Sequence, residues 1–164
     1  MMKDVLQEIS EQLDQLDTLE EAIDVAIKLE EDGRAYYLKR SESMPNPAAR
    51  EMYAFLAGEE EKHADMLRKF KNGDKKAAHV EHHFPDFTPS LTQEFSDKKL
   101  EEIGILLAAL RFEYKSEYFY TELGRRATEP EQKEFFDRIA AAERGHYRLI
   151  DEMLQAATEF RMQT

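Results

Sequence analysis

Two short stretches of the chain each carry a glutamate and a histidine three positions apart. GEEEKHADML contains Glu60 and His63, and AAAERGHYRL contains Glu143 and His146. Side chains at this spacing are neighbours on one face of a helix, so each pair could offer a carboxylate and an imidazole to the same metal ion. One such pair in an acidic chain could equally be an ordinary solvated helix face. A second pair with the same spacing weakens that interpretation.

The two stretches belong to a longer internal repeat, which a shift of 83 positions, from Glu60 to Glu143, aligns without a gap. Similarity at a fixed shift indicates that one structural unit occurs twice. Two further glutamates, two tyrosines and two prolines fall into register with the motifs. The coinciding positions are Ile23 and Leu106, Ala26 and Ala109, Ile27 and Leu110, Glu30 and Glu113, Tyr37 and Tyr120, Pro47 and Pro130, Tyr53 and Phe136, Leu56 and Ile139, Glu60 and Glu143, and His63 and His146.

The aligned glutamates and histidines interrupt apolar stripes. Around them apolar residues recur at three- and four-residue spacing, which is typical of the buried face of a helix. We therefore expect six polar side chains on core faces: Glu30, Glu60, His63, Glu113, Glu143 and His146. Their charged neighbours fall outside the stripes and are expected in solvent: Glu31, Glu59, Glu61 and Arg144.

The spacing around the turns predicts that the four glutamates lie at one height. Residues equidistant from the turn are level in an antiparallel helix pair. Glu30 and Glu60 are equidistant from Pro45, and the corresponding glutamates of the second half are equidistant from Thr128. Packing the two hairpins together would then bring four carboxylates and two imidazoles to the middle of one bundle.

Four buried carboxylates need compensation, because an ionised group in a core must be paired or bind a metal. The only basic residue at a neighbouring stripe position is Arg34, near Glu30. Two divalent cations would neutralise four carboxylates, and a mixed carboxylate and imidazole set suits iron or manganese. The alternative is a buried, partly protonated cluster of structural salt bridges, which leaves the duplication unexplained.

The remaining sequence predicts an all-α, single-domain protein. Residues 1–17 form a short amphipathic helix, 18–72 a first hairpin, 73–95 a crossover and 96–160 a second hairpin. Thr18 and Glu21 form a capping box at the start of the first long helix. Asn46 and Pro47 start the second, and Gly73 ends it. The stripe of the leading helix is Leu6, Ile9, Leu13 and Leu16.

The long connection at 73–95 decides the topology. Short turns within each hairpin make its two helices antiparallel. A loop this long is uncommon inside a compact domain, unless the chain must travel back along the bundle. We therefore expect an antiparallel four-helix bundle in which the second and third long helices run in the same direction.

The composition excludes several classes of function. Acidic residues outnumber basic residues by 35 to 23, for a formal charge of −12. Nucleic acid and anionic membranes are therefore not expected partners. The absence of cysteine excludes disulfides and thiolate metal sites. With no signal-like or membrane-spanning stretch, we expect a cytoplasmic protein. His79, His82 and His83 could bind metal, but an exposed polar loop is the preferred interpretation of HVEHH.

The residues quoted so far resemble those of the rubrerythrin group of ferritin-like diiron proteins. The pattern is one glutamate from each of two helices and Glu-x-x-His from each of the other two. EEDGRAYY and EYKSEYFY each carry a glutamate followed seven positions later by a tyrosine, and FLAGEEEKHADML is similar to the second helix of that group. The resemblance covers roughly residues 18–155 and implies a ferritin-like fold with two bound iron ions.

The resemblance also implies a role for each residue. Glu60 and Glu143 would bridge the irons, Glu30 with His63 would be terminal ligands of one iron, and Glu113 with His146 would be terminal ligands of the other. Tyr37 and Tyr120 would donate hydrogen bonds that orient the ligating carboxylates. For the two tyrosines, plain core packing is an almost equally good interpretation. Manganese, or a mixed iron and manganese pair, is an alternative occupant.

The sequence departs from that group in two ways. Rubrerythrins typically add a glutamate three residues after the ligand on the third helix, where this chain has Ser116, and the nearest carboxylate, Glu117, is one position further round. This makes the ligand set closer to that of ferritins and bacterioferritins. The four cysteines of a rubredoxin module are also absent, so electrons would come from Fe(II) itself or from a separate electron-donor protein.

Together these features predict a diiron oxidoreductase that oxidises Fe(II) with O2 or H2O2, either to reduce peroxide or to detoxify iron. The alternative is a non-catalytic subunit that binds or stores iron in a larger assembly. We expect a homodimer, partly because the stripe of the leading helix needs a partner surface, although that stripe could also fold back on its own bundle.

Overall fold

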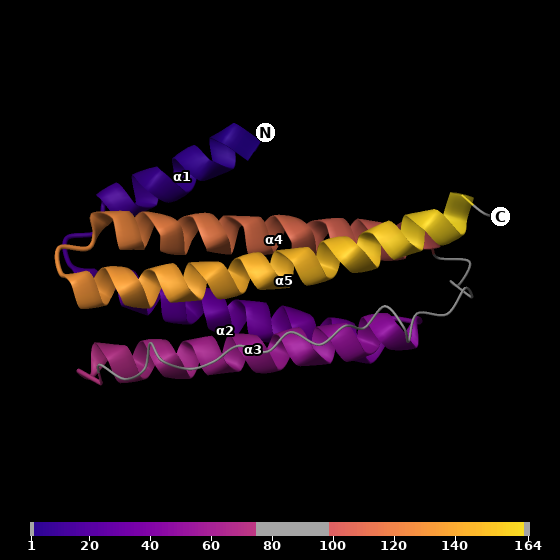
Figure 1. The fold of residues 1–164 in the computed structure, drawn as a ribbon, viewed down its shortest axis with the longest axis horizontal. Helices are drawn as coiled ribbons and strands as arrows, with labels where there is room; N and C mark the ends of the chain where they lie inside the picture. Colours follow the sequence, from indigo (N-terminus) through magenta and orange to yellow (C-terminus); the bar gives the residue numbers. More distant parts are fainter. Residues whose placement is uncertain (1, 75–98, 163–164) are drawn as a thin grey trace.

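The computed structural model describes residues 2–74 and 99–162, and these form five helices and no strand. The helices are α1 (Met2–Asp14), α2 (Leu19–Ser43), α3 (Pro47–Lys71), α4 (Lys99–Arg126) and α5 (Pro130–Met162). In Figure 1 the four long helices lie side by side along one axis. The predicted all-α bundle is confirmed. None of the described helices is long and apolar enough to cross a membrane.

Local sequence signals set most helix ends. The Thr18 side chain caps α2 by accepting a hydrogen bond from the backbone N–H of Glu21 at 3.1 Å. Met44, the residue before Pro45, is extended and ends α2. Asn46 caps α3, which begins at Pro47. Gly73 follows α3 with a φ of 93°, a left-handed conformation that glycine adopts without strain.

The two hairpins are α2 with α3 and α4 with α5. Figure 1 shows that α3 and α4 begin at the same end of the bundle and run in the same direction, as predicted. Within the described residues the third long helix runs from Lys99 to Arg126, and its predicted start at residue 96 lies outside them. Most of the predicted crossover, with its three histidines, lies outside the described residues.

The core consists of two apolar clusters separated by a polar layer. One cluster lies where α2 begins and α3 ends, and it includes Ile23, Leu67 and Phe136. The other, further along the bundle, includes Leu56 and Ile150. On every long helix the glutamates and histidines of the repeat fall between residues of the two clusters. The polar layer is therefore closed on both sides along the bundle axis.

Helix α1 folds back on its own bundle and packs against α4. Leu13 is buried, and Ile9 and Leu16 pack against the same cluster. Arg126 of α4 fixes the orientation, because its Nη1 lies 2.6 Å from Asp14 Oδ1. Burying the stripe of α1 therefore does not require a second chain, and the expected homodimer remains a prediction that rests on no observed surface.

Replacing Leu13 by alanine should lower the free energy of unfolding by about 2 kcal/mol or more, because the deletion leaves a cavity under α1. Leu100→Ala is the matched control, since Leu100 is 66% exposed and should change stability by less than about 0.5 kcal/mol. Chemical denaturation of metal-free protein measures both. Equal losses would contradict the docking of α1 on this bundle.

Candidate metal centre

The structure brings all six predicted polar residues together in the middle of the bundle. Two overlapping groups form there, one of Glu30, Glu60, His63 and Glu143, and one of Glu60, Glu113, Glu143 and His146. Within each group, one possible ligand atom per residue lies within 4.8 Å of all the others. All six side chains are at most 1% exposed. Glu60 and Glu143 belong to both groups.

Both histidines turn the same ring nitrogen toward the carboxylates. The Nδ1 atom of His63 lies 3.0 Å from Glu143 Oε1 and 3.5 Å from Glu30 Oε2. The Nδ1 atom of His146 lies 3.5 Å from Glu143 Oε2 and 3.6 Å from an oxygen of both Glu60 and Glu113. The two rings stack with their centroids 5.5 Å apart. Both Nδ1 atoms therefore face the carboxylate oxygens of the two groups.

The two tyrosines of the repeat connect the hairpins across the cluster. Tyr37 on α2 donates a hydrogen bond to Glu113 Oε1 on α4 at 2.6 Å. Tyr120 on α4 donates one to Glu30 Oε1 on α2 at 2.5 Å. Each hydroxyl therefore orients a carboxylate of the opposite hairpin by binding its Oε1 atom. The Oε2 atom of that carboxylate takes no part in this hydrogen bond. Such hydrogen bonds fix ligand orientation in metal sites.

Gly33 is part of the site, although the sequence interpretation did not single it out. A Cβ atom at this position would lie 3.0 Å from Glu60 Oε2 and 2.8 Å from Cζ of Phe112. Only glycine leaves room for both the shared carboxylate and the aromatic ring. The available signal was a glycine inside a helix, three positions after Glu30, where glycine costs stability.

Burial and mutual repulsion control the protonation of the carboxylates. Burial, followed by the charges of Glu30 and Glu143, raises the pKa of Glu60 well above its usual range. Burial and then Glu143 raise the pKa of Glu113. Burial alone would also raise the pKa of Glu143, but hydrogen bonds with Glu113 and the two histidines hold it well below its usual range. The cluster therefore keeps Glu143 ionised and favours protons on its neighbours.

The neighbouring carboxylates favour the protonated form of both histidines. Burial alone would lower the pKa of His63, but the charge of Glu30 raises it well above its usual value. For His146, Glu113 outweighs burial and raises the pKa to about 9. Each imidazole would have to lose a proton before its Nδ1 could bind a metal.

Several buried carboxylate oxygens in the cluster lack a well-formed hydrogen bond among the described residues, and where a histidine Nδ1 faces them it lies 3.5–3.6 Å away. They are Glu30 Oε2, both oxygens of Glu60, Glu113 Oε2 and Glu143 Oε2. A buried acceptor without a donor costs about 1–3 kcal/mol, and divalent cations would satisfy these oxygens together. Oxygen and imidazole nitrogen donors without sulfur fit iron or manganese. The residues present therefore fit a two-metal centre.

One neighbour of the motif lies inside the protein, contrary to expectation. Glu59, expected in solvent, is 1% exposed, with Lys62 Nζ 3.5 Å from its Oε2. The buried face of α3 is wider than one stripe, because Met52 and Met66, seven residues to either side, are buried as well. Glu59 belongs to neither ligand group. The other neighbours are exposed as predicted: Glu31, Glu61 and Arg144.

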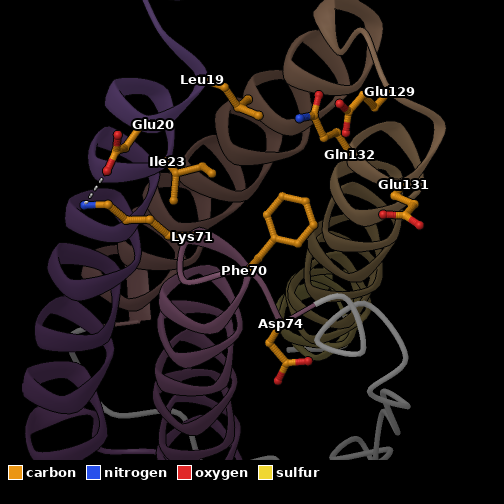
Figure 2. Close-up of a pocket in the computed structure, with 10 residues that line it drawn as sticks. Leu19, Glu20, Ile23, Phe70, Lys71, Asp74, Glu129, Glu131 and Gln132 are labelled. Atoms are coloured by element: carbon orange, nitrogen blue, oxygen red, sulfur yellow. Dashed lines mark ion pairs between the residues drawn. The ribbon is translucent and has the colours of Figure 1, made fainter.

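A separate pocket of about 380 Å³ lies between the start of α2, the end of α3 and the turn that joins α4 to α5. Figure 2 shows the Phe70 ring in its centre, with the acidic side chains of Asp74, Glu129 and Glu131 around it. Lys71 and Glu20 form an ion pair at its rim, at 4.0 Å. None of the six cluster residues lines this pocket, so it is not an opening to the candidate metal centre.

Comparison with known proteins agrees with the architecture of the site. The model of the rubrerythrin family matches residues 21–154, which include all six cluster residues and both tyrosines. No curated protein and no solved structure matches the chain.

Metal binding should release protons and tighten as pH rises, because the raised pKa values of Glu60, Glu113 and both histidines favour their protonated forms in metal-free protein. Titration calorimetry with Mn(II), which O2 does not readily oxidise, should give binding enthalpies that differ between buffers of different ionisation enthalpy. Affinity should fall steadily as pH is lowered from about 8 to about 6, because the proton on His146, whose pKa is raised to about 9, competes more strongly with the metal. Identical enthalpies together with a pH-independent affinity would contradict this assignment.

Proposed function

Because the matched region spans most of its length, the chain belongs to the rubrerythrin family, and we propose that it is a non-haem diiron oxidoreductase. Its substrates would be Fe(II) and O2 or H2O2, with peroxide reduction or Fe(II) oxidation as the outcome. The observation that carries the proposal is the pair of overlapping four-residue groups that share Glu60 and Glu143. A structural salt-bridge cluster would need no such sharing.

In this proposal each side chain has a defined part. Glu60 and Glu143 hold both ions, Glu30 and His63 complete one site, and the last pair, Glu113 and His146, completes the other. When bound, iron supplies the electrons that reduce the oxidant. Tyr37 and Tyr120 keep the terminal carboxylates in place through their hydrogen bonds. The apolar clusters on both sides exclude bulk water and so strengthen the electrostatic interactions inside.

The surroundings of Ser116 favour a symmetric set of six ligands. Ser116 is 1% exposed, so its position faces the interior without a carboxylate. Glu117 is not available as a substitute, because its Oε1 lies 3.0 Å from Nε of Arg144, which is exposed. Iron oxidation is thus the better supported outcome, while repeated peroxide reduction would need an electron supply that reduces the metal pair again.

Aerobic titration of metal-free protein with Fe(II) tests the proposal. We expect an oxidation band that saturates at two irons per chain. Glu60→Ala should abolish loading, because it removes a ligand that both ions share. Glu61→Ala is the matched control, since Glu61 is one position on and exposed, and pairs only with Arg34 at 3.7 Å among the described residues.

Two results would overturn the proposal. Saturation at clearly fewer than two irons would exclude the pair of sites. Loading of two irons without any oxidation band would leave only binding or storage, and a solution mass far above that of a dimer would then favour a storage assembly.

A further inference from the structure

The residue three positions after the glutamate on the first helix of each hairpin differs between the two halves of the repeat. After Glu30 it is Gly33, and after Glu113 it is Ser116. Ser116 is 1% exposed, and its Oγ atom makes no hydrogen bond among the described residues. A hydroxyl that is buried without a partner lowers stability, so this one needs a physical reason.

Other hydroxyl side chains on the helices of this protein do bond to the backbone. A serine or threonine inside a helix can donate to a carbonyl oxygen three or four residues earlier. Four side chains do so, at distances from 2.6 to 3.1 Å: Ser41, Ser43, Thr121 and Thr158. Ser116 makes no such bond, so its hydroxyl is available to a ligand.

Helical phase directs the Ser116 side chain toward the candidate metal centre. Glu113, Ser116 and Tyr120 are separated by three and four residues on α4, so their side chains share one face of the helix. The residues on either side of Ser116 both reach the cluster. Glu113 belongs to one of the ligand groups, and Tyr120 donates to Glu30. The side chain between them therefore faces the same polar layer.

The repeat gives the position of Ser116 more closely, because the two halves of the cluster have nearly the same geometry. The two tyrosine hydrogen bonds are 2.6 and 2.5 Å long. Each histidine Nδ1 lies 3.5 or 3.6 Å from the terminal glutamate of its own half. A Cβ atom at Gly33 would lie 3.0 Å from Glu60 Oε2. Ser116 and Glu143 are the corresponding residues, so we expect the Ser116 Cβ atom at a similar distance from the Glu143 carboxylate.

The first half has no space for an additional side-chain atom at this place. The ring of Phe112 fills it, because its Cζ would lie only 2.8 Å from a Cβ atom at Gly33. The residue that corresponds to Phe112 in the repeat is Leu29, which has no ring. Beside the shared glutamates, the first half therefore presents a hydrocarbon ring and the second half a hydroxyl.

We propose that the Ser116 hydroxyl donates a hydrogen bond to a small ligand that binds at the metal pair beside Glu143. Such a ligand needs an acceptor atom and a size of only a few atoms, as in peroxide or azide. The inference rests on the proposed diiron function, whose oxidant has to be held at the cluster. Ionised carboxylates only accept hydrogen bonds, and the hydroxyls of Tyr37 and Tyr120 already donate to glutamates. Ser116 supplies a donor that neither group can supply.

Azide tests the inference, because it reports binding rather than turnover. Protein that has been loaded with two irons and oxidised in air is titrated with sodium azide, and the azide-to-iron charge-transfer absorbance gives the affinity. Ser116→Ala should weaken azide binding about tenfold, the size expected of a hydrogen bond to a charged group. It should also shift the infrared band of bound azide. Ser116→Thr, which keeps the hydroxyl, should retain most of the affinity.

Tyr53→Phe is the matched control. The Tyr53 hydroxyl is also buried without a hydrogen bond among the described residues, but its side chain belongs to an apolar cluster rather than to the polar layer. Its removal should leave the azide affinity and the infrared band unchanged. Metal-free Ser116→Ala should be at least as stable to chemical denaturation as wild-type protein, because the substitution removes an unpaired buried atom.

The iron content of each variant separates the possible failures. Wild-type protein that does not take up two irons contradicts the proposed function itself. Ser116→Ala that loads two irons and binds azide as tightly as wild-type protein overturns the inference alone, and so does wild-type protein that loads iron but binds no azide. Reduced iron content in Ser116→Ala with unchanged azide affinity would overturn it too, because the hydroxyl would then serve the metal ligands. An equal loss of affinity in Tyr53→Phe, or a clear loss of stability in metal-free Ser116→Ala, would overturn it by showing a role in packing.

Discussion

The structure depends on how four carboxylates can be buried at the centre of a helical bundle. No lysine or arginine enters the cluster among the described residues, and the nearby basic side chain, Arg34, pairs outward with Glu61. Two imidazoles, two phenol donors and shared protons therefore carry the compensation. Because the cost of an unpaired buried charge is high, these groups must meet at one height. Helix phase, turn position and the space left by Gly33 all serve that requirement.

The sequence predicts this layer well because helical periodicity and the repeat are independent constraints. Periodicity places Glu60 and His63 on the core face, and the copy at Glu143 and His146 removes the alternative of a solvated acidic stretch. Turn signals such as Asn46 and Pro47 then fix the level of each residue. The short turns within each hairpin and the long connection between the hairpins predict the direction in which each long helix runs. All of these are local or pairwise properties of the chain, which is why no tertiary contact was needed to predict them.

Other features depend on contacts that periodicity does not contain. Glu59 is buried because α3 is covered over more than one stripe. The hydroxyls of Tyr37 and Tyr120 reach the opposite hairpin rather than their own. These contacts depend on the distance between α2 and α4. The choice of α1 between its own bundle and a second chain depends on the surface around Leu13 and Arg126. The spacing of residues within one helix does not predict any of these contacts.

The two halves of the repeat keep the same candidate ligands at corresponding positions, whereas many of the residues around them differ. The central claim remains that two metal ions share Glu60 and Glu143. Anomalous diffraction at the iron edge, from crystals loaded with Fe(II), tests it most directly. The account predicts two strong peaks inside the bundle, each coordinated by both shared glutamates and by one histidine. A single peak, or peaks outside this cluster, would contradict it.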